Sequence, residues 1–283
     1  IDTLILNGGG LKLDETNPQN LTVHYLTTYP GSSGGSLSNI DGANKVTVTD
    51  QAFLGSSITS IHEQHYLSDV YLWADTTLTS KLGSVTFDGN VTGFSAGLQF
   101  LGNGQYIYNG HIYTASSSSI YLGGGLSLSY SNGRYQFSSA IDGSADLLVV
   151  GGGGAGGMGG GGGGGVLIKD ITYSAYSIYD VLVGAGGINA GNSSYWTGRN
   201  GSNSQFGSYI AVGGGGNGAY YSGPNPATGE PAHTWINGTS GLANTGSGGG
   251  GGIWCCNAPG SGGSGIVALQ VRNTPNLTLN MGM

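Results

Sequence analysis

The stretch from Leu147 to Gly165 reads LLVVGGGGAGGMGGGGGGG, so four apolar residues run directly into a glycine tract that only Ala155 and Met158 interrupt. Each glycine costs about 1 kcal/mol relative to alanine in a helix interior, and in a strand it offers no side chain to pack. Two interpretations remain for such a tract. It is a flexible linker, or it is a set of polyproline-II-like glycine segments packed backbone to backbone, as glycine permits at the crowded axis of collagen.

Further glycine tracts follow, and they alternate with apolar runs. The tracts are GAGG at 184–187, GGGG at 213–216, GGGGG at 248–252 and GG at 262–263. The apolar runs are VLI at 166–168, YDVLV at 179–183, YIAV at 209–212 and IVAL at 266–269. A linker has no need of apolar runs, whereas a packed core requires them. The alternation therefore predicts a folded glycine-rich domain, in which packed polyglycine-II-type helices are joined to short strands.

Residues 1–143 differ from the glycine-rich half of the chain. Here short runs, in which apolar and polar residues alternate, are separated by polar turns. The pairs Asn109-Gly110 and Asn132-Gly133 each lie between β-prone runs. Asn-Gly is the strongest short signature of a β-hairpin, since both residues tolerate positive φ. The expected fold class is all-β. We expect an antiparallel β-sandwich-like domain for assembly or attachment over 1–143, the glycine-rich domain with aromatic loops over 144–272, and a tail or last strand over 273–283.

Composition narrows the classes of function. The chain has 283 residues, of which 60 are glycine and 7% are charged, and its formal net charge is −7. The seven Lys and Arg residues are scattered, which argues against nucleic acid as a partner. No apolar run approaches the roughly 20 residues of a membrane span. Low charge with abundant Ser, Thr, Asn, Tyr and Gly is typical of fibres and extracellular surfaces. We therefore expect an extracellular or virion-surface protein, whose start at Ile1 indicates processing or a fragment.

The chain carries no convincing catalytic pattern. His62-Glu63-Gln64-His65 lacks the HExxH spacing of zinc enzymes, and no Gly-Lys-Ser/Thr follows a glycine tract. A carbohydrate-active enzyme would need paired carboxylates in a groove, and Glu230 and Asp180 do not make that case. We expect no enzymatic activity, no cofactor and no metal site.

The candidate recognition residues are aromatic and lie in the long loops between the glycine tracts. Exposed aromatic side chains with few charges suit contacts with sugar rings or with loops of a surface protein. The alternative for each tryptophan is that it caps the glycine core. The candidates are Tyr195, Trp196, Tyr220, Tyr221, His233, Trp235 and Trp254.

The two cysteines, Cys255 and Cys256, are adjacent. A disulfide between these two residues cannot cross-link distant parts of the chain. A strained vicinal disulfide, a pairing with another subunit and buried thiols all stay open.

The order of motifs in the second half resembles a known family. The motifs are LVV at 148–150 before the long tract, VLVGAGG at 181–187, GSNSQFG at 201–207, AVGGGG at 211–216 and GGSGIV at 262–267. This order resembles the glycine-rich domain at the C-terminal ends of bacteriophage tail fibre proteins, and it is similar in style to polyglycine-sandwich adhesins at long-tail-fibre tips. The resemblance covers residues 145–272. It implies a rigid glycine-helix core that displays variable loops to a host receptor.

Two hypotheses of function follow. The first is a non-enzymatic fibre protein or adhesin that recognises a glycan or protein of a host surface. The second is a structural subunit of an extracellular filament, assembled as a homo-oligomer by β-strand exchange. In the second hypothesis the strand donated to a neighbouring subunit is either the first strand, with Ile1, Leu4, Ile5 and Leu6, or the C-terminal tail.

Overall fold

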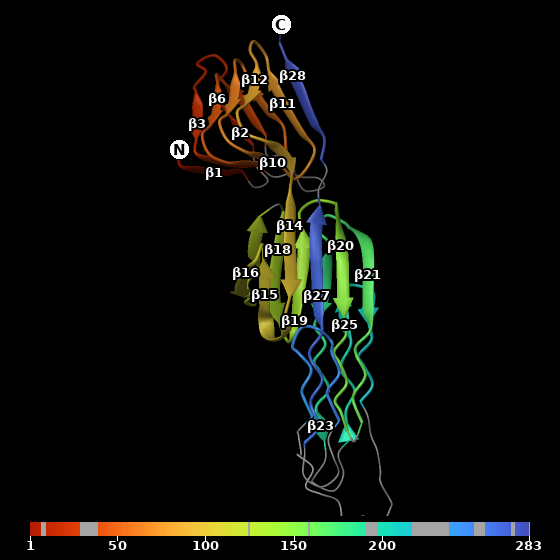
Figure 1. The fold of residues 1–283 in the computed structure, drawn as a ribbon. Coiled ribbons are helices and arrows are strands. Elements are labelled where there is room, and N and C mark those ends of the chain that lie inside the picture. Colours follow the sequence, from red (N-terminus) through yellow and green to blue (C-terminus); the bar gives the residue numbers. More distant parts are fainter. Residues whose placement is uncertain are drawn as a thin grey trace, which may run out of the picture.

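The structure is a computed structural model, and it describes residues 1–6, 10–28, 39–123, 125–157, 159–190, 197–216, 238–251, 258–272 and 275–282. Apart from the short 3-10 helix η1 (Gly102–Gly104), the described residues form strands and non-helical segments, which confirms the all-β class. Figure 1 shows three parts in series. A stack of short strands holds both chain ends, a pair of longer-stranded sheets follows, and undulating glycine segments extend beyond it.

Residues 1–93 and the last strand form a three-sided stack of parallel strands, which we call the solenoid. All of its strand pairs are parallel. The first side has the order β1 (Thr3–Leu6), β4 (Tyr25–Thr28), β7 (Ala52–Leu54), β10 (Val70–Leu72) and β13 (Val91–Gly93). The second has β2 (Leu11–Lys12), β5 (Ile40–Ala43), β8 (Ile58–Ser60), β11 (Thr76–Ser80) and β28 (Leu277–Met281). The third has β12 (Val85–Phe87), β9 (Gln64–Tyr66), β6 (Val46–Val48) and β3 (Leu21–Val23).

The antiparallel arrangement predicted for this segment is therefore wrong. Ala52 pairs with Val70, and Gln64 pairs with Val85. The chain thus comes back beside itself after about 20 residues, a period typical of solenoids. Inward residues alternate with outward ones in strands of three to five residues. That alternation has the same appearance in parallel and antiparallel strands, so it does not distinguish the two.

The strand β28 completes the last rung of the solenoid. The chain leaves the solenoid after β13, builds the rest of the molecule and returns, so that β28 pairs with β11 from Leu277 opposite Thr76 to Met281 opposite Ser80. The backbone N–H of Asn276 also donates to a carboxylate oxygen of Asp75 at 2.8 Å.

Ending the chain after Arg272 should destabilise the solenoid. The truncation removes the partners of the β11 backbone groups that face β28, while the groups that face β8 stay paired. We expect the free energy of unfolding to fall by about 1–3 kcal/mol. The thermal transition of the protein should move to a lower temperature, as measured by calorimetry. An unchanged thermogram would mean that β28 contributes nothing to the solenoid.

The middle part is an antiparallel β-sandwich of two six-stranded sheets. The first sheet has the order β16 (His111–Thr114), β15 (Gln105–Tyr108), β14 (Ser95–Phe100), β27 (Ile266–Arg272), β20 (Gly143–Val150) and β21 (Val166–Tyr173). The second has β17 (Ile120–Gly123), β18 (Leu126–Ser131), β19 (Arg134–Ser139), β22 (Ile178–Leu182), β25 (Ser204–Phe206) and β26 (Tyr209–Ala211). Strands from both sides of residue 143 share each sheet, and their inward side chains form one buried core.

Both predicted hairpins are confirmed. Strands β15 and β16 meet at Asn109 (φ 46°) and Gly110 (φ 86°). Strands β18 and β19 meet at Asn132 (φ 52°) and Gly133 (φ 77°). Positive φ at two successive residues is the geometry of a turn that matches the twist of the flanking strands, which is why Asn-Gly marks these positions.

Beyond the sandwich the glycine segments form a bundle whose hydrogen bonds repeat every three residues. The donors of segment 151–156 and their carbonyl acceptors are Gly151 to Gly165, Gly152 to Ser202, Gly153 to Gly263, Gly154 to Gly162, Ala155 to Arg199 and Gly156 to Gly260, all at 2.8–3.0 Å. Three residues per turn with bonds only to other segments is the geometry of a polyproline-II-type helix. The predicted packing of polyglycine-II-type helices is thus confirmed.

Segment 151–156 is the axis of this glycine bundle. It donates to three neighbouring segments, and its carbonyls accept from three others through the amides of Gly187, Gly214 and Gly249 at 2.7–3.0 Å. All six of its residues are buried. A Cβ built on Gly153 would lie 2.0 Å from the Ser247 carbonyl oxygen. Glycine is therefore required here for close backbone approach, not for positive φ, which no glycine of this segment adopts.

Candidate functional site at the distal end of the glycine bundle

The predicted recognition residues fall in three segments, 191–196, 217–237 and 252–257, that lie outside the described residues. This applies to Tyr195, Trp196, Tyr220, Tyr221, His233, Trp235 and Trp254, and also to Cys255 and Cys256. What the structure does describe is where the chain enters and leaves each of these segments.

The residues that flank the three segments lie beside one another. Before and after the first segment, β23 (Asn189–Ala190) pairs with β24 (Thr197–Gly198). The Asn189 side-chain amide donates to the carbonyl of Pro259, which flanks the third segment. Gly238 follows the second segment, and its N–H donates to the Ala258 carbonyl at 3.0 Å. These contacts join the ends of all three segments.

Gly216, which precedes the second segment, belongs to the same group. A Cβ on Gly216 would lie 2.2 Å from the Gly198 carbonyl oxygen, and its N–H donates to the Asn200 side chain at 2.8 Å. In Figure 1, β23 lies at the end of the bundle farthest from the solenoid. We call this the distal end. The chain therefore enters and leaves all three aromatic segments at one end of the molecule, opposite the two termini.

The scaffold behind the distal end carries almost no charge. Within the described stretches 151–157, 159–165, 184–190, 197–203, 212–216, 238–251 and 258–265, Arg199 is the single charged side chain. The part of the chain that the structure describes has no group of three or more His, Cys, Asp or Glu placed to hold a metal ion. Backbone hydrogen bonds and the neutral side chains of Asn189 and Asn200 hold this end in shape. The chemistry of the distal end thus depends on the side chains of the three segments.

The predicted exchange strand lies in its own chain's sheet. β1 pairs with β4, with Leu4 opposite Leu26 and Leu6 opposite Thr28. It is the outermost strand of that sheet, and Ile1 and Ile5 are 69% and 59% exposed. One chain by itself does not test exchange between subunits, so exchange stays a prediction.

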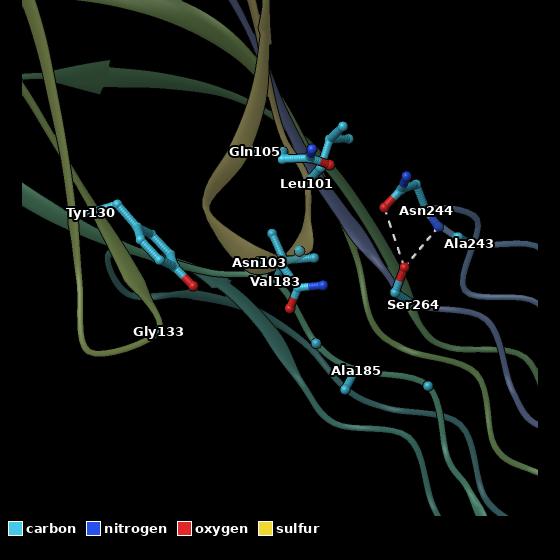
Figure 2. Close-up of a pocket in the computed structure, with 13 residues that line it drawn as sticks. Leu101, Asn103, Gln105, Tyr130, Gly133, Val183, Ala185, Ala243, Asn244 and Ser264 are labelled. Carbon is cyan, nitrogen blue, oxygen red and sulfur yellow. Dashed lines mark hydrogen bonds between the residues drawn. The ribbon is translucent and has the colours of Figure 1, made fainter. Parts of the chain in front are cut away.

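A cleft that the sequence does not predict lies at the other end of the glycine bundle. Asn103, Tyr130 and Ser264 are among the residues that line it (Figure 2). Nothing local in the sequence marks it, because the lining residues come from segments far apart in the chain.

Comparison with known proteins supports the glycine-rich domain of the predicted resemblance. A family model described as a glycine-rich domain matches residues 130–233, which run from the end of β18 through the first glycine segments. No curated protein matches the chain. The chain therefore contains a glycine-rich domain. Among the described residues, no helix is long and apolar enough to cross a membrane.

Proposed function

We propose that this protein is a non-enzymatic recognition protein of the tail-fibre or adhesin type, displayed on a virion or in the extracellular space. The observation that carries the proposal is the convergence, at the distal end, of the residues that flank the three aromatic segments. A rigid scaffold lowers the entropy lost when its loops bind a partner, because the loop ends are already fixed. The partner would be a glycan or a protein of a host cell surface.

The chemistry of the three segments fits this role. They hold the tryptophans Trp196, Trp235 and Trp254, and tryptophan is enriched among the residues that dominate binding energy. The nearly uncharged scaffold offers little electrostatic attraction of its own. Affinity would therefore come from aromatic contacts and hydrogen bonds in the segments.

The double variant Trp196→Ala/Trp235→Ala tests the proposal. We expect binding to cells that the wild-type protein labels to fall at least about tenfold, because aromatic anchors at an interface commonly contribute 2 kcal/mol or more each. Binding of the fluorescently labelled protein to a panel of bacterial cells measures this. The matched control is Tyr113→Ala, which removes an exposed aromatic side chain from the sandwich. Unchanged labelling by the double variant would refute recognition through these segments.

The alternative is a structural subunit of an extracellular filament, assembled by exchange of β1. The observation that favours it is the position of β1 at the outer edge of its sheet, since an edge strand can template pairing with another chain. Ile5 on this strand and Ile1, which precedes it, are both exposed. Electron microscopy of the purified protein separates the two functions. Regular filaments that vanish when residues 1–6 are removed would favour the subunit, whereas discrete particles would favour the recognition protein.

A further inference from the structure

A cleft of about 460 Å³ lies where the sandwich meets the glycine bundle. Figure 2 shows that its walls come from three parts of the chain. They are the turn around η1, the β18–β19 hairpin, and the glycine bundle, which contributes residues 183–186, 243–244 and 264 from three of its segments. The lining residues are Leu101, Gly102, Asn103, Gln105, Tyr130, Gly133, Val183, Gly184, Ala185, Gly186, Ala243, Asn244 and Ser264. The volume lies within the range of small-molecule sites.

The first wall is held by Tyr135. Its hydroxyl contacts the carbonyl oxygens of both Leu101 and Gln105, which close the turn on both sides, and shares its one proton between them. Burial, followed by the neighbouring Tyr130, raises the pKa of Tyr135, so the hydroxyl keeps the proton that it donates. Asn103 lies at the tip of this turn with φ 64°. The backbone of the turn is thus positioned before any ligand arrives.

The second wall is the aromatic ring of Tyr130, and neighbouring residues hold this ring in place as well. The Tyr130 ring lies 4.7 Å from the Tyr135 ring, centroid to centroid. A Cβ on Gly104 would lie 2.9 Å from the Tyr130 ring, so glycine at this residue leaves room for the ring. On the bundle side, Ser264 Oγ accepts from the Asn244 backbone N–H at 2.8 Å and donates to the Asn244 side chain at 3.2 Å (Figure 2).

The polar groups of the cleft are neutral. Asn103, Gln105 and Asn244 supply planar amides, and Tyr130 and Ser264 supply hydroxyls. No acid, Lys, Arg or His lines it among the described residues. A charged ligand would lose hydration here without gaining a counter-charge. The amide side chains of Asn103 and Gln105 have no hydrogen-bond partner among the described residues, and both residues are exposed.

We propose that this cleft binds a neutral saccharide unit. Sugar rings combine hydroxyls, which exchange hydrogen bonds with amides, and C–H faces, which pack on an aromatic ring. Asn103 and Gln105 hydrogen-bond the hydroxyls, and Tyr130 supplies the aromatic surface. The site is distinct from the distal end, so it stands whether or not the three aromatic segments bind a partner.

Titration of the full-length protein with neutral disaccharides tests the proposal. The probes are lactose, maltose and N,N′-diacetylchitobiose, with sialyllactose as the anionic comparator, and ligand-observed NMR is the readout. We expect at least one neutral probe to bind with a Kd below about 10 mM. The variant Asn103→Gly/Gln105→Ala should weaken that binding about tenfold or more, through lost hydrogen bonds. Glycine retains the positive φ at residue 103, so the turn persists.

The control is Asn132→Gly, the same change at a positive-φ asparagine (φ 52°) that does not line the cleft. It should leave the affinity unchanged. Trp196→Ala/Trp235→Ala should also leave it unchanged, which separates this site from the distal end. Three results would overturn the proposal: no neutral probe binds, only sialyllactose binds, or the Asn103→Gly/Gln105→Ala protein binds as the wild type does.

Discussion

Gly153→Ala should unfold the glycine bundle or destabilise it by about 3 kcal/mol or more. A Cβ at this residue would lie 2.0 Å from the Ser247 carbonyl oxygen and 2.4 Å from its carbonyl carbon. Neither atom can rotate away, because both belong to the backbone of a neighbouring segment. Overpacking a well-packed interior costs about 1–3 kcal/mol when side chains can adjust, and more is expected where they cannot. Urea unfolding followed by circular dichroism measures the loss.

Gly215→Ala is the matched control, in the same bundle and with the same added methyl group. Gly215 is exposed, and a Cβ there meets nothing within 4 Å. The change should be neutral or stabilise by about 0.4–1 kcal/mol, because alanine has less conformational freedom in the unfolded chain. Equal effects of Gly153→Ala and Gly215→Ala would contradict a close-packed bundle.

Trp73→Ala should cost about 3–5 kcal/mol and weaken the coupling between solenoid and sandwich. Trp73 follows β10 of the solenoid, and it is 1% exposed. Its ring belongs to the sandwich core, while its Nε1–H donates to the Thr28 carbonyl in the solenoid at 2.8 Å. Its loss should separate one unfolding transition into two, as seen by calorimetry.

Trp73→Phe distinguishes packing from hydrogen bonding at this junction. Phenylalanine fills most of the space but leaves the Thr28 carbonyl without that donor, so a smaller loss of about 1–3 kcal/mol is expected. A loss below about 1 kcal/mol for Trp73→Ala would mean that the tryptophan does not join the two parts.

The glycine bundle and the hairpins could be predicted because their causes are local. A tract such as 151–157 excludes ordinary helix and strand, and the apolar runs beside it exclude a linker. The turn at Asn132 and Gly133 follows from the φ angles that these two residues tolerate. In both cases a few neighbouring residues determine the conformation.

The solenoid and the cleft could not be predicted because their causes are not local. Asn276 and Asp75, which join the last rung, are 201 residues apart, and Gln270 and Ser95 of the sandwich are 175 apart. No pattern within a short window reports such pairing. The aromatic candidates could be named from composition, but the convergence of their flanking residues at the distal end depends on how seven glycine segments pack.

The central claim is that the glycine tracts form a packed scaffold, and amide hydrogen exchange measured by NMR tests it most directly. We predict slow exchange at residues 151–156, whose N–H groups are all bonded to other segments, and at Gly161, Gly162, Gly164 and Gly165. Gly163, whose N–H has no partner among the described residues, should exchange faster than the residues on either side of it. Exchange of all these glycines at the rate of an unstructured peptide would contradict the account.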